Sequence, residues 1–440
     1  METKDIFLIL KDFDLKPSDP IPDEDDLESI INTISEITEY DEDIIEFNVL
    51  NYFNEIVLTS DDIIKNHKII KKLDAAPQPE QRSPEWFAMR ETMITASDMA
   101  TAIEENPYQR PFDLIKKKCH ITGYHPNKYT EWGVKYEPVA DLVYKYKIGK
   151  EIKEYGLLKH DTISMIGASP DGITADGIMV EIKCPFCRKI TGIVPHYYWI
   201  QIQIQLEVCD LQWSHFEECG LSEYDTEDDF ILDSNQDGQP YLTLDNKNKG
   251  VVVVASDDNL NKLEYFYSEI TLSYQELNRW TEQKVEEICD NPKLSYVKTT
   301  YWKLDTFSCV KVERDREWFK EALPKIYKFW DQLTYYKENH DALLDLLNEK
   351  KFNKYMFLDK EEKPNKKKNK EFPDKCLFLD DKEYEKQSYP IETVVQSIKP
   401  KKKEVCLFLD DKEYEKKSYQ IENVVQPVKP KKKEEYLFLD

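Results

Sequence analysis

The chain has 440 residues, of which 40% are hydrophobic and 33% charged, so one part can bury a core while another part stays solvated. Its formal net charge of −25 argues against a nucleic-acid coat protein and against a basic protein of the membrane surface. The N-terminus shows no charged-then-apolar leader, and no apolar run approaches the ~20 residues of a membrane span. We therefore expect an intracellular chain with neither signal peptide nor transmembrane segment, whose nine scattered cysteines are reduced thiols.

Residues 1–74 are predicted to form a small, acidic, helical N-terminal module. Apolar residues recur at helical spacing over residues 26–40, and the run Ser60-Asp61-Asp62 is typical of the start of a helix that continues to residue 73. Residues 75–81 have the proline-containing composition of a linker. A packed domain should therefore begin near residue 82.

Residues 82–345 have the pattern of a packed domain in which helices and short strands alternate. A helix should begin at Ser83-Pro84-Glu85 and turn Trp86 and Met89 inward. Apolar residues at helical spacing predict further helices, and short apolar runs beside turn residues predict strands. The predicted helices are 130–146, 196–209, 257–290 and 314–338, and the predicted strands are 156–158, 165–167, 177–183, 213–217, 250–254 and 310–312.

Residues 346–440 are predicted to be a charged, low-complexity, disordered tail. Residues 376–405 and 406–435 are near-identical tandem repeats of about 30 residues, too charged to stack into a solenoid core. The Leu-Phe-Leu-Asp run of each repeat is either a by-product of repeat expansion or a docking motif for a partner. The lysine runs of the tail are solvated spacers, phosphate contacts or nuclear-localisation-like strings.

Two carboxylates flank a predicted turn between two strands. Asp171 follows Pro170 after one strand, and Glu181 lies on the next strand, with glycines marking the turn between them. If the two strands pair as a hairpin, the two carboxylates lie side by side. Adjacent carboxylates repel each other and are normally kept ionised by a cation, and oxygen ligands suit Mg²⁺, with Mn²⁺ as a substitute.

Lys183 lies two residues after Glu181, so both side chains should share one face of the strand. Its ammonium group can orient or deprotonate an attacking water, or neutralise charge in a transition state. A metal-bound water would be the nucleophile, and the carbonyl of Ile182 is the kind of group that adds a further metal ligand. The string of Asp171, Glu181 and Lys183 is loose by itself, and chance would produce it often.

Further blocks surround this string in a fixed order. They are W-F-A-M-R (86–90), I-T-A-S (94–97), W-G-V-K-Y-E (132–137), S-P-D-G (169–172), E-I-K-C-P-F (181–186), Y-W-I-Q-I-Q (198–203) and V-E-R-D (312–315). In order and spacing, the blocks within residues 82 to about 219 resemble the YqaJ-like viral recombinase family, which contains phage lambda exonuclease and falls within the PD-(D/E)XK nucleases. The block at 312–315 resembles the final strand and the start of the last helix of that family.

The resemblance implies an α/β fold with a PD-(D/E)XK restriction-endonuclease-like core, in which helices flank a mixed central sheet. It implies that Asp171 and Glu181 hold the metal and that Glu137 completes the carboxylate set. Lys183 would act on the nucleophilic water, which Gln201 would help to orient. Taken singly, Glu137 fits a solvated helix residue and Gln201 fits polar filler.

The resemblance also implies that Arg90 and Ser97 receive the terminal 5′-phosphate of a DNA strand, a role that suits a forked guanidinium. The implied reaction is Mg²⁺-dependent hydrolysis of DNA phosphodiesters, 5′ to 3′ from linear duplex ends, in viral recombination or repair. The implied partners are duplex DNA ends, a single-strand annealing protein and further copies of the chain in a ring. Two alternatives stay open: a related endonuclease or single-strand nuclease, and a non-catalytic DNA-binding scaffold with a docking tail.

Several segments depart from the family pattern. Residues 221 to about 300 are an insertion of unknown role, and the N-terminal module and the tail lie outside the resemblance. The C-x-x-C at 184–187 lacks a second pair, which argues against zinc, and the other cysteines fit an iron–sulfur cluster poorly. The composition and the tandem repeat suggest the AT-rich genome of a large DNA virus, which would place the protein in host cytoplasm, a virus factory or the virion.

Overall fold

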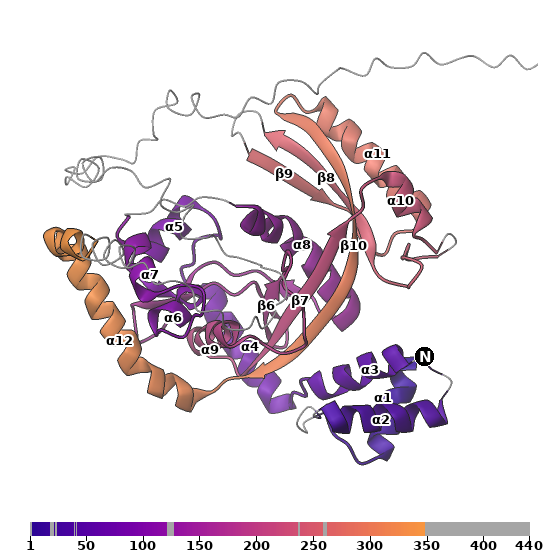
Figure 1. Ribbon diagram of the computed structural model, residues 1–440, viewed down its shortest axis with the longest axis horizontal. Helices are drawn as coiled ribbons and strands as arrows, with labels where there is room; N and C mark the ends of the chain where they lie inside the picture. The colour runs from indigo at the N-terminus through magenta and orange to yellow at the C-terminus, as the bar shows by residue number, and fades with distance from the viewer. Residues whose placement is uncertain are drawn as a thin grey trace, which may run out of the picture. The chain divides into compact units, whose positions relative to one another are not determined.

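The computed structural model describes residues 2–17, 22, 24–38, 40, 42–120, 127–235, 238–257 and 262–347 (Figure 1). The tandem repeats, and the disorder predicted for them, lie outside these residues. No described helix combines the length and the apolar composition needed to cross a membrane.

Helices α1 (Glu2–Asp12), α2 (Glu24–Ile37) and α3 (Glu42–Asn54) pack around a small core of their own. Their buried apolar side chains are Ile6, Leu10, Ile34, Ile45, Val49, Tyr52 and Phe53. Helix α4 (Ser60–Ala75) begins with a reciprocal capping box between Thr59 and Asp62, and its Leu73 packs with the main core of the chain. The helices predicted over residues 26–40 and 60–73 are confirmed.

The central sheet has seven strands in the order β2-β5-β6-β7-β10-β8-β9. Only β6 and β7 pair in parallel among its described neighbours, and the other pairs are antiparallel, so the sheet is mixed. A second sheet joins three short strands in the order β1-β4-β3. The strands are β1 (Ile94–Thr95), β2 (Ile152–Lys153), β3 (Leu158–Lys159), β4 (Ile166–Ala168), β5 (Gly172–Thr174), β6 (Met179–Lys183), β7 (Trp213–Glu223), β8 (Lys249–Asp257), β9 (Lys262–Tyr267) and β10 (Leu294–Glu313).

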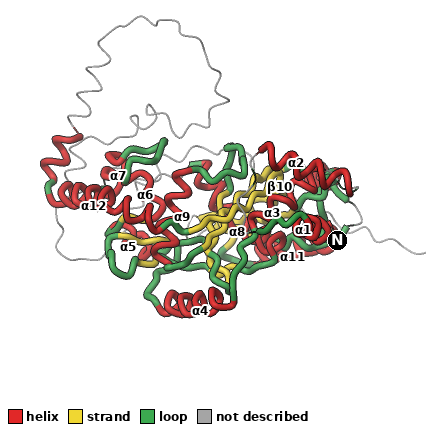
Figure 2. The backbone as a smooth tube through the Cα atoms, turned by 90° about the horizontal axis from the view of Figure 1, so that it is seen from below, coloured by secondary structure: helices red, strands yellow, loops and turns green. Residues whose placement is uncertain are grey.

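Helices cover both faces of the central sheet because alternate strand residues enter two different cores. Val180 and Ile182 of β6 pack with α8 (Lys128–Ile148), whereas Met179 packs on the opposite face with α9 (His196–Cys209). The domain also contains helices α5 (Pro84–Glu91), α6 (Ala96–Ala102), α7 (Pro111–Lys118) and α12 (Arg316–Glu338). Figure 2 shows α6, α7 and α12 gathered on one side of the strands. The predicted fold, a mixed sheet flanked by helices, is confirmed.

The insertion extends the central sheet. After the end of β7 it forms α10 (Glu227–Leu232), β8, β9, α11 (Tyr274–Asp290) and the start of β10, and α10 and α11 share an apolar cluster with β8 (Figure 1). The helix predicted over residues 257–290 is confirmed for α11 but wrong for β9. Tyr265 and Tyr267 of β9 lie opposite Val254 and Val252, so pairing with a distant strand outweighs the local helical spacing.

Candidate active site

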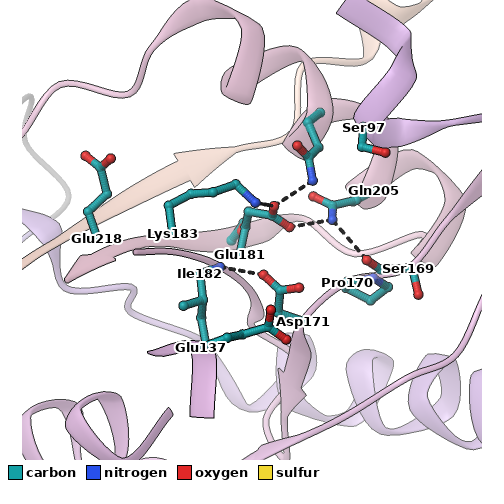
Figure 3. Close-up of polar contacts among 12 residues, drawn as sticks. Ser97, Glu137, Ser169, Pro170, Asp171, Glu181, Ile182, Lys183, Gln205 and Glu218 are labelled. Carbon is teal, nitrogen blue, oxygen red and sulfur yellow. Dashed lines mark hydrogen bonds and ion pairs between the residues drawn. The ribbon is translucent and has the colours of Figure 1, made fainter. Parts of the chain in front are cut away.

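Asp171 and Glu181 are opposite each other at the β5–β6 hairpin. Gly172 pairs with Val180, which places Asp171, one residue earlier, across from Glu181, one residue later. Asp171 Oδ2 accepts a hydrogen bond of 2.7 Å from the backbone N–H of Ile182. The structure thus brings together the two carboxylates that the hairpin prediction placed side by side, with Ile182 between Glu181 and Lys183 (Figure 3).

The Glu181 side chain is buried, and both of its carboxylate oxygens accept hydrogen bonds. Oε1 accepts from Lys183 Nζ and, at 2.6 Å, from Gln201 Nε2. Oε2 accepts from Gln205 Nε2, also at 2.6 Å. The predicted neighbours Lys183 and Gln201 therefore meet Glu181, and a second glutamine joins them.

Lys183 carries its charge in this environment. Burial lowers the pKa of its ammonium group, but the charges of Glu181 and Asp171 outweigh burial and leave the pKa above its ordinary value. The ammonium also lies 5.2 Å from the centre of the Tyr198 ring. Of the roles predicted for Lys183, orienting a water and stabilising negative charge therefore fit the geometry better than removing a proton.

Glu137 approaches the same region from α8. In Figure 3 Glu137 lies below Asp171 and Glu181. Burial and the charge of Glu181 raise the pKa of Asp171 well above its ordinary value, and Glu137 adds to this effect. Burial also raises the pKa of Glu137, although Arg82, whose Nη2 lies 2.9 Å from Glu137 Oε2, opposes the shift. The three carboxylates therefore sense one another's charge.

The donor set fits a hard divalent cation. Carboxylate oxygens are the ligands that Mg²⁺ and Mn²⁺ prefer, and mutual repulsion of this kind is relieved by a cation. Within the described ranges, no three His, Cys, Asp or Glu side chains are already arranged around a metal position. Mg²⁺ does not require such a cage, since one or two carboxylates, waters and substrate phosphates usually bind it. Asp171 and Glu181, with Glu137 and the Ile182 carbonyl, are the groups that would hold it.

Arg90 and Ser97 also lie together, as the sequence motifs implied. Arg90 Nη2 donates to Ser97 Oγ at 3.0 Å, and the guanidinium lies 4.3 Å from the centre of the Trp86 ring. Trp86 Nε1 donates to Ser169 Oγ at 3.2 Å, two residues before Asp171. Trp86 therefore links the Arg90–Ser97 pair to the turn that carries Asp171. Trp86 and Met89 were expected to face inward, and both are half-buried, although α5 contains no fully buried residue.

Two neighbours of the carboxylates were missed from the sequence. Gln205 lies four residues after Gln201, and this spacing puts both on one face of α9, so the helical period was a usable signal. Gln203 was part of the matched motif but faces away, donating to the Glu313 carbonyl and accepting from the Asp315 N–H. Arg82 precedes α5, and nothing in the sequence pattern points to its contact with Glu137.

The fold and the site define an α/β domain in which two carboxylates and a lysine lie together on a hairpin of a mixed sheet. Residues 85–212 match the family model described as the YqaJ-like viral recombinase domain. This match covers the segment in which the sequence blocks predicted a resemblance to that family.

Viral proteins and several solved structures are similar to this chain. An uncharacterized protein of Acanthamoeba polyphaga mimivirus is 30% identical over 68% of this chain, and the match spans 60% of that relative's length. Protein D345L of African swine fever virus is 24% identical, over 57% of this chain and 85% of the relative. An alkaline exonuclease from Laribacter hongkongensis has 20% identity and a TM-score of 0.35, covering 60% of this chain and 100% of that one. A phage-related exonuclease from Haemophilus somnus has 12% identity and a TM-score of 0.30, covering 55% and 95%.

Proposed function

We propose that the domain is a Mg²⁺-dependent DNA exonuclease that hydrolyses phosphodiesters from the 5′ ends of linear duplex, in viral DNA recombination or repair. The observation that carries the proposal is the position of Asp171 opposite Glu181, with Lys183 bonded to Glu181 on the same strand face. Two carboxylates and a cation in this arrangement suit hydrolysis of a phosphodiester, since they can hold a metal and stabilise a charged transition state. The match of residues 85–212 to the family model supports the same reaction class.

Each side chain has a defined part in this reaction. A bound Mg²⁺ would supply Lewis acidity and a water of lowered pKa. Glu181 is fixed by donors on both oxygens, so Gln201 and Gln205 hold it in one orientation. Lys183, kept charged by its neighbours, would place its ammonium against the attacking water or the phosphoryl oxygens.

The Arg90–Ser97 pair would bind the terminal phosphate and so give the enzyme its direction. A guanidinium held by a hydroxyl partner and an aromatic ring is suited to bind a phosphate with forked hydrogen bonds. Trp86 joins this pair to the turn before Asp171. When Arg90 binds the 5′-phosphate of a DNA strand, the first phosphodiester bonds of that strand would lie at the carboxylates of Asp171 and Glu181.

The test compares end-labelled linear duplex carrying a 5′-phosphate with the same duplex carrying a 5′-hydroxyl, together with closed circular duplex and single-stranded DNA, all with Mg²⁺. We expect degradation from the 5′-phosphate end, none of the circle, and a loss of at least about 100-fold in Asp171→Ala. Cutting of the closed circle would show an endonuclease instead. If no DNA is cut, and Lys183→Ala binds DNA as the parent does, the protein is a DNA-binding scaffold.

A further inference from the structure

Arg82 is a cation at the candidate active site to which the family motifs give no role. It follows the linker and directly precedes α5, and its Nη2 lies 2.9 Å from Glu137 Oε2. Its backbone has a φ of 65°, in the left-handed region that costs a non-glycine residue about 1 kcal/mol. An arginine at a position that glycine would occupy without strain indicates that the side chain is useful there.

Among the groups that are bonded to the three carboxylates, Arg82 can leave its carboxylate most readily. Asp171 is bonded to a backbone N–H, which is fixed within the sheet. Glu181 is bonded to Lys183, whose side chain is 23% exposed, and to glutamines on α9. The Arg82 side chain is 46% exposed and lies outside any helix or strand, so it can swing into solvent without disturbing packed elements.

Arg82 is also separated from Arg90 by a single short helix. Arg90, in the last turn of α5, is the candidate ligand of the terminal phosphate, and Arg82 stands just before the first turn of this eight-residue helix. The helix is about 12 Å long, a length that covers a few nucleotides of one DNA strand. Arg82 and Arg90 therefore flank one short helix, whose Trp86 donates to Ser169 in the turn before Asp171.

We propose that Arg82 is paired with Glu137 in the metal-free protein and leaves this carboxylate when a divalent cation binds there. The freed guanidinium then binds the DNA backbone. This inference rests on the proposed function. A divalent cation and a guanidinium compete for the carboxylate of Glu137, so breaking the ion pair between Arg82 and Glu137 weakens the binding of the metal. A new ion pair between the Arg82 guanidinium and a DNA phosphate offsets the free energy lost at Glu137. Metal binding and DNA binding are thereby coupled.

The first experiment measures Mn²⁺ affinity of the full chain without DNA, from the electron paramagnetic resonance signal of free Mn²⁺. The proteins are wild type, Arg82→Gln, Arg82→Gly and the control Lys72→Gln, which removes an exposed cation from another ion pair, with Asp161. Because a part-exposed ion pair contributes little, we expect both Arg82 variants to bind Mn²⁺ about two- to fivefold more tightly. The control should be unchanged, and Arg82→Gly should fold at least as stably as wild type because it removes the left-handed strain.

The second experiment measures binding of a 5′-phosphorylated duplex in Mg²⁺ at several salt concentrations, in a Lys183→Ala background that prevents turnover. Adding Arg82→Gln should weaken binding and reduce the slope of log affinity against log salt by about one, as expected for one lost phosphate contact. A purely structural role for Arg82 would leave the slope unchanged.

The outcomes separate this inference from the function on which it rests. Mn²⁺ affinity that is equal or weaker in both Arg82 variants overturns the competition for Glu137. An unchanged salt slope overturns the transfer of the guanidinium to DNA. If wild type binds no Mn²⁺ at all, the proposed metal-dependent function fails together with the inference, whereas Mn²⁺ binding that Asp171→Ala abolishes supports the function independently of Arg82.

Discussion

Gln201 and Gln205, one turn apart on α9, donate to different oxygens of the Glu181 carboxylate, each at 2.6 Å. Glu181 lies on β6, so the two amides connect a helix to the strand that carries the candidate metal ligand. Hydrogen bonds to a charged group are short and strong, and a pair of them fixes the plane of a carboxylate as one bond cannot. The orientation of Glu181 is therefore set by α9.

We predict that Gln205→Leu lowers turnover on linear duplex by about 10- to 100-fold, the range typical of lost partners of a metal ligand. The reason is that Glu181 Oε2 loses its donor, and the carboxylate can then rotate away from the metal position. Turnover is measured with saturating Mg²⁺ and DNA, and thermal unfolding is measured in parallel.

Gln203→Leu is the matched control because Gln203 lies on the same helix but faces β10 and α12. It loses bonds of 2.8 Å to the Glu313 carbonyl and 2.6 Å from the Asp315 N–H, so it should reduce the free energy of unfolding by about 1–3 kcal/mol. Equal losses of turnover in the two variants, at temperatures where both are folded, would refute a specific role for Gln205.

Asp171→Asn should stabilise the metal-free protein while abolishing activity. Burial and Glu181 hold the pKa of Asp171 well above its ordinary value, so the ionised carboxylate destabilises the fold at neutral pH. A neutral amide removes this repulsion, and we expect a gain on the order of 1–2 kcal/mol in urea unfolding with a chelator present.

Asp176→Asn is the opposite case on the same hairpin. Asp176 lies 2.7 Å from Lys150 and accepts a hydrogen bond from Thr174, and these contacts, against the effect of burial, hold its pKa below the ordinary value. Its replacement should therefore destabilise the protein. If both variants shift stability in the same direction, the charge repulsion inferred at Asp171 is wrong.

Trp86 and Arg90 should affect different steps. Trp86→Phe keeps an aromatic ring beneath Arg90 but loses the N–H that donates to Ser169, so turnover should fall about two- to tenfold with end preference intact. Arg90→Gln removes the guanidinium, so we expect similar rates on 5′-phosphate and 5′-hydroxyl ends. The measurement is the ratio of initial rates on the two ends, and an unchanged ratio in Arg90→Gln would exclude Arg90 from phosphate recognition.

The local part of the site was predictable because short spacings determine it. A hairpin register puts Asp171 opposite Glu181, and the strand period puts Lys183 on the face of Glu181. Arg90 and Ser97 were found only through family resemblance, since a seven-residue separation across a turn does not reveal a contact. The domain boundaries at residues 74 and 345, like the roles of the tail repeats, stay predictions.

The long-range part of the site could not be predicted from local pattern. Arg82 meets Glu137 across 55 residues, from a left-handed residue beside a linker. β9 has helical spacing in sequence, yet it pairs with β8, because its aromatic residues 265–267 suit a strand. The strand at 250–254 was predicted, but the sequence did not show which segment pairs with it. Such contacts depend on how separate elements pack, which no window of sequence contains.

His215 should make stability depend on pH. It lies buried on β7, with Nδ1 2.8 Å from the Tyr144 hydroxyl, and burial, assisted by Lys150, lowers its pKa to about 3. Because the unfolded histidine has a pKa of about 6.5, the unfolded state takes up the proton first as pH falls. The contribution of His215 to the free energy of unfolding is therefore fully present above about pH 6.5. It is lost as the pH falls from there to about 3, at about 1.4 kcal/mol per pH unit.

His215→Asn removes this dependence, because asparagine keeps an acceptor for Tyr144 but binds no proton. We expect the difference in free energy of unfolding between wild type and variant to be constant from pH 8 to 7. It should then shift in favour of the variant by about 2–3 kcal/mol by pH 4.5, as measured by urea unfolding. Parallel pH curves for wild type and His215→Asn would show that His215 is protonated as readily in the folded chain as in the unfolded one.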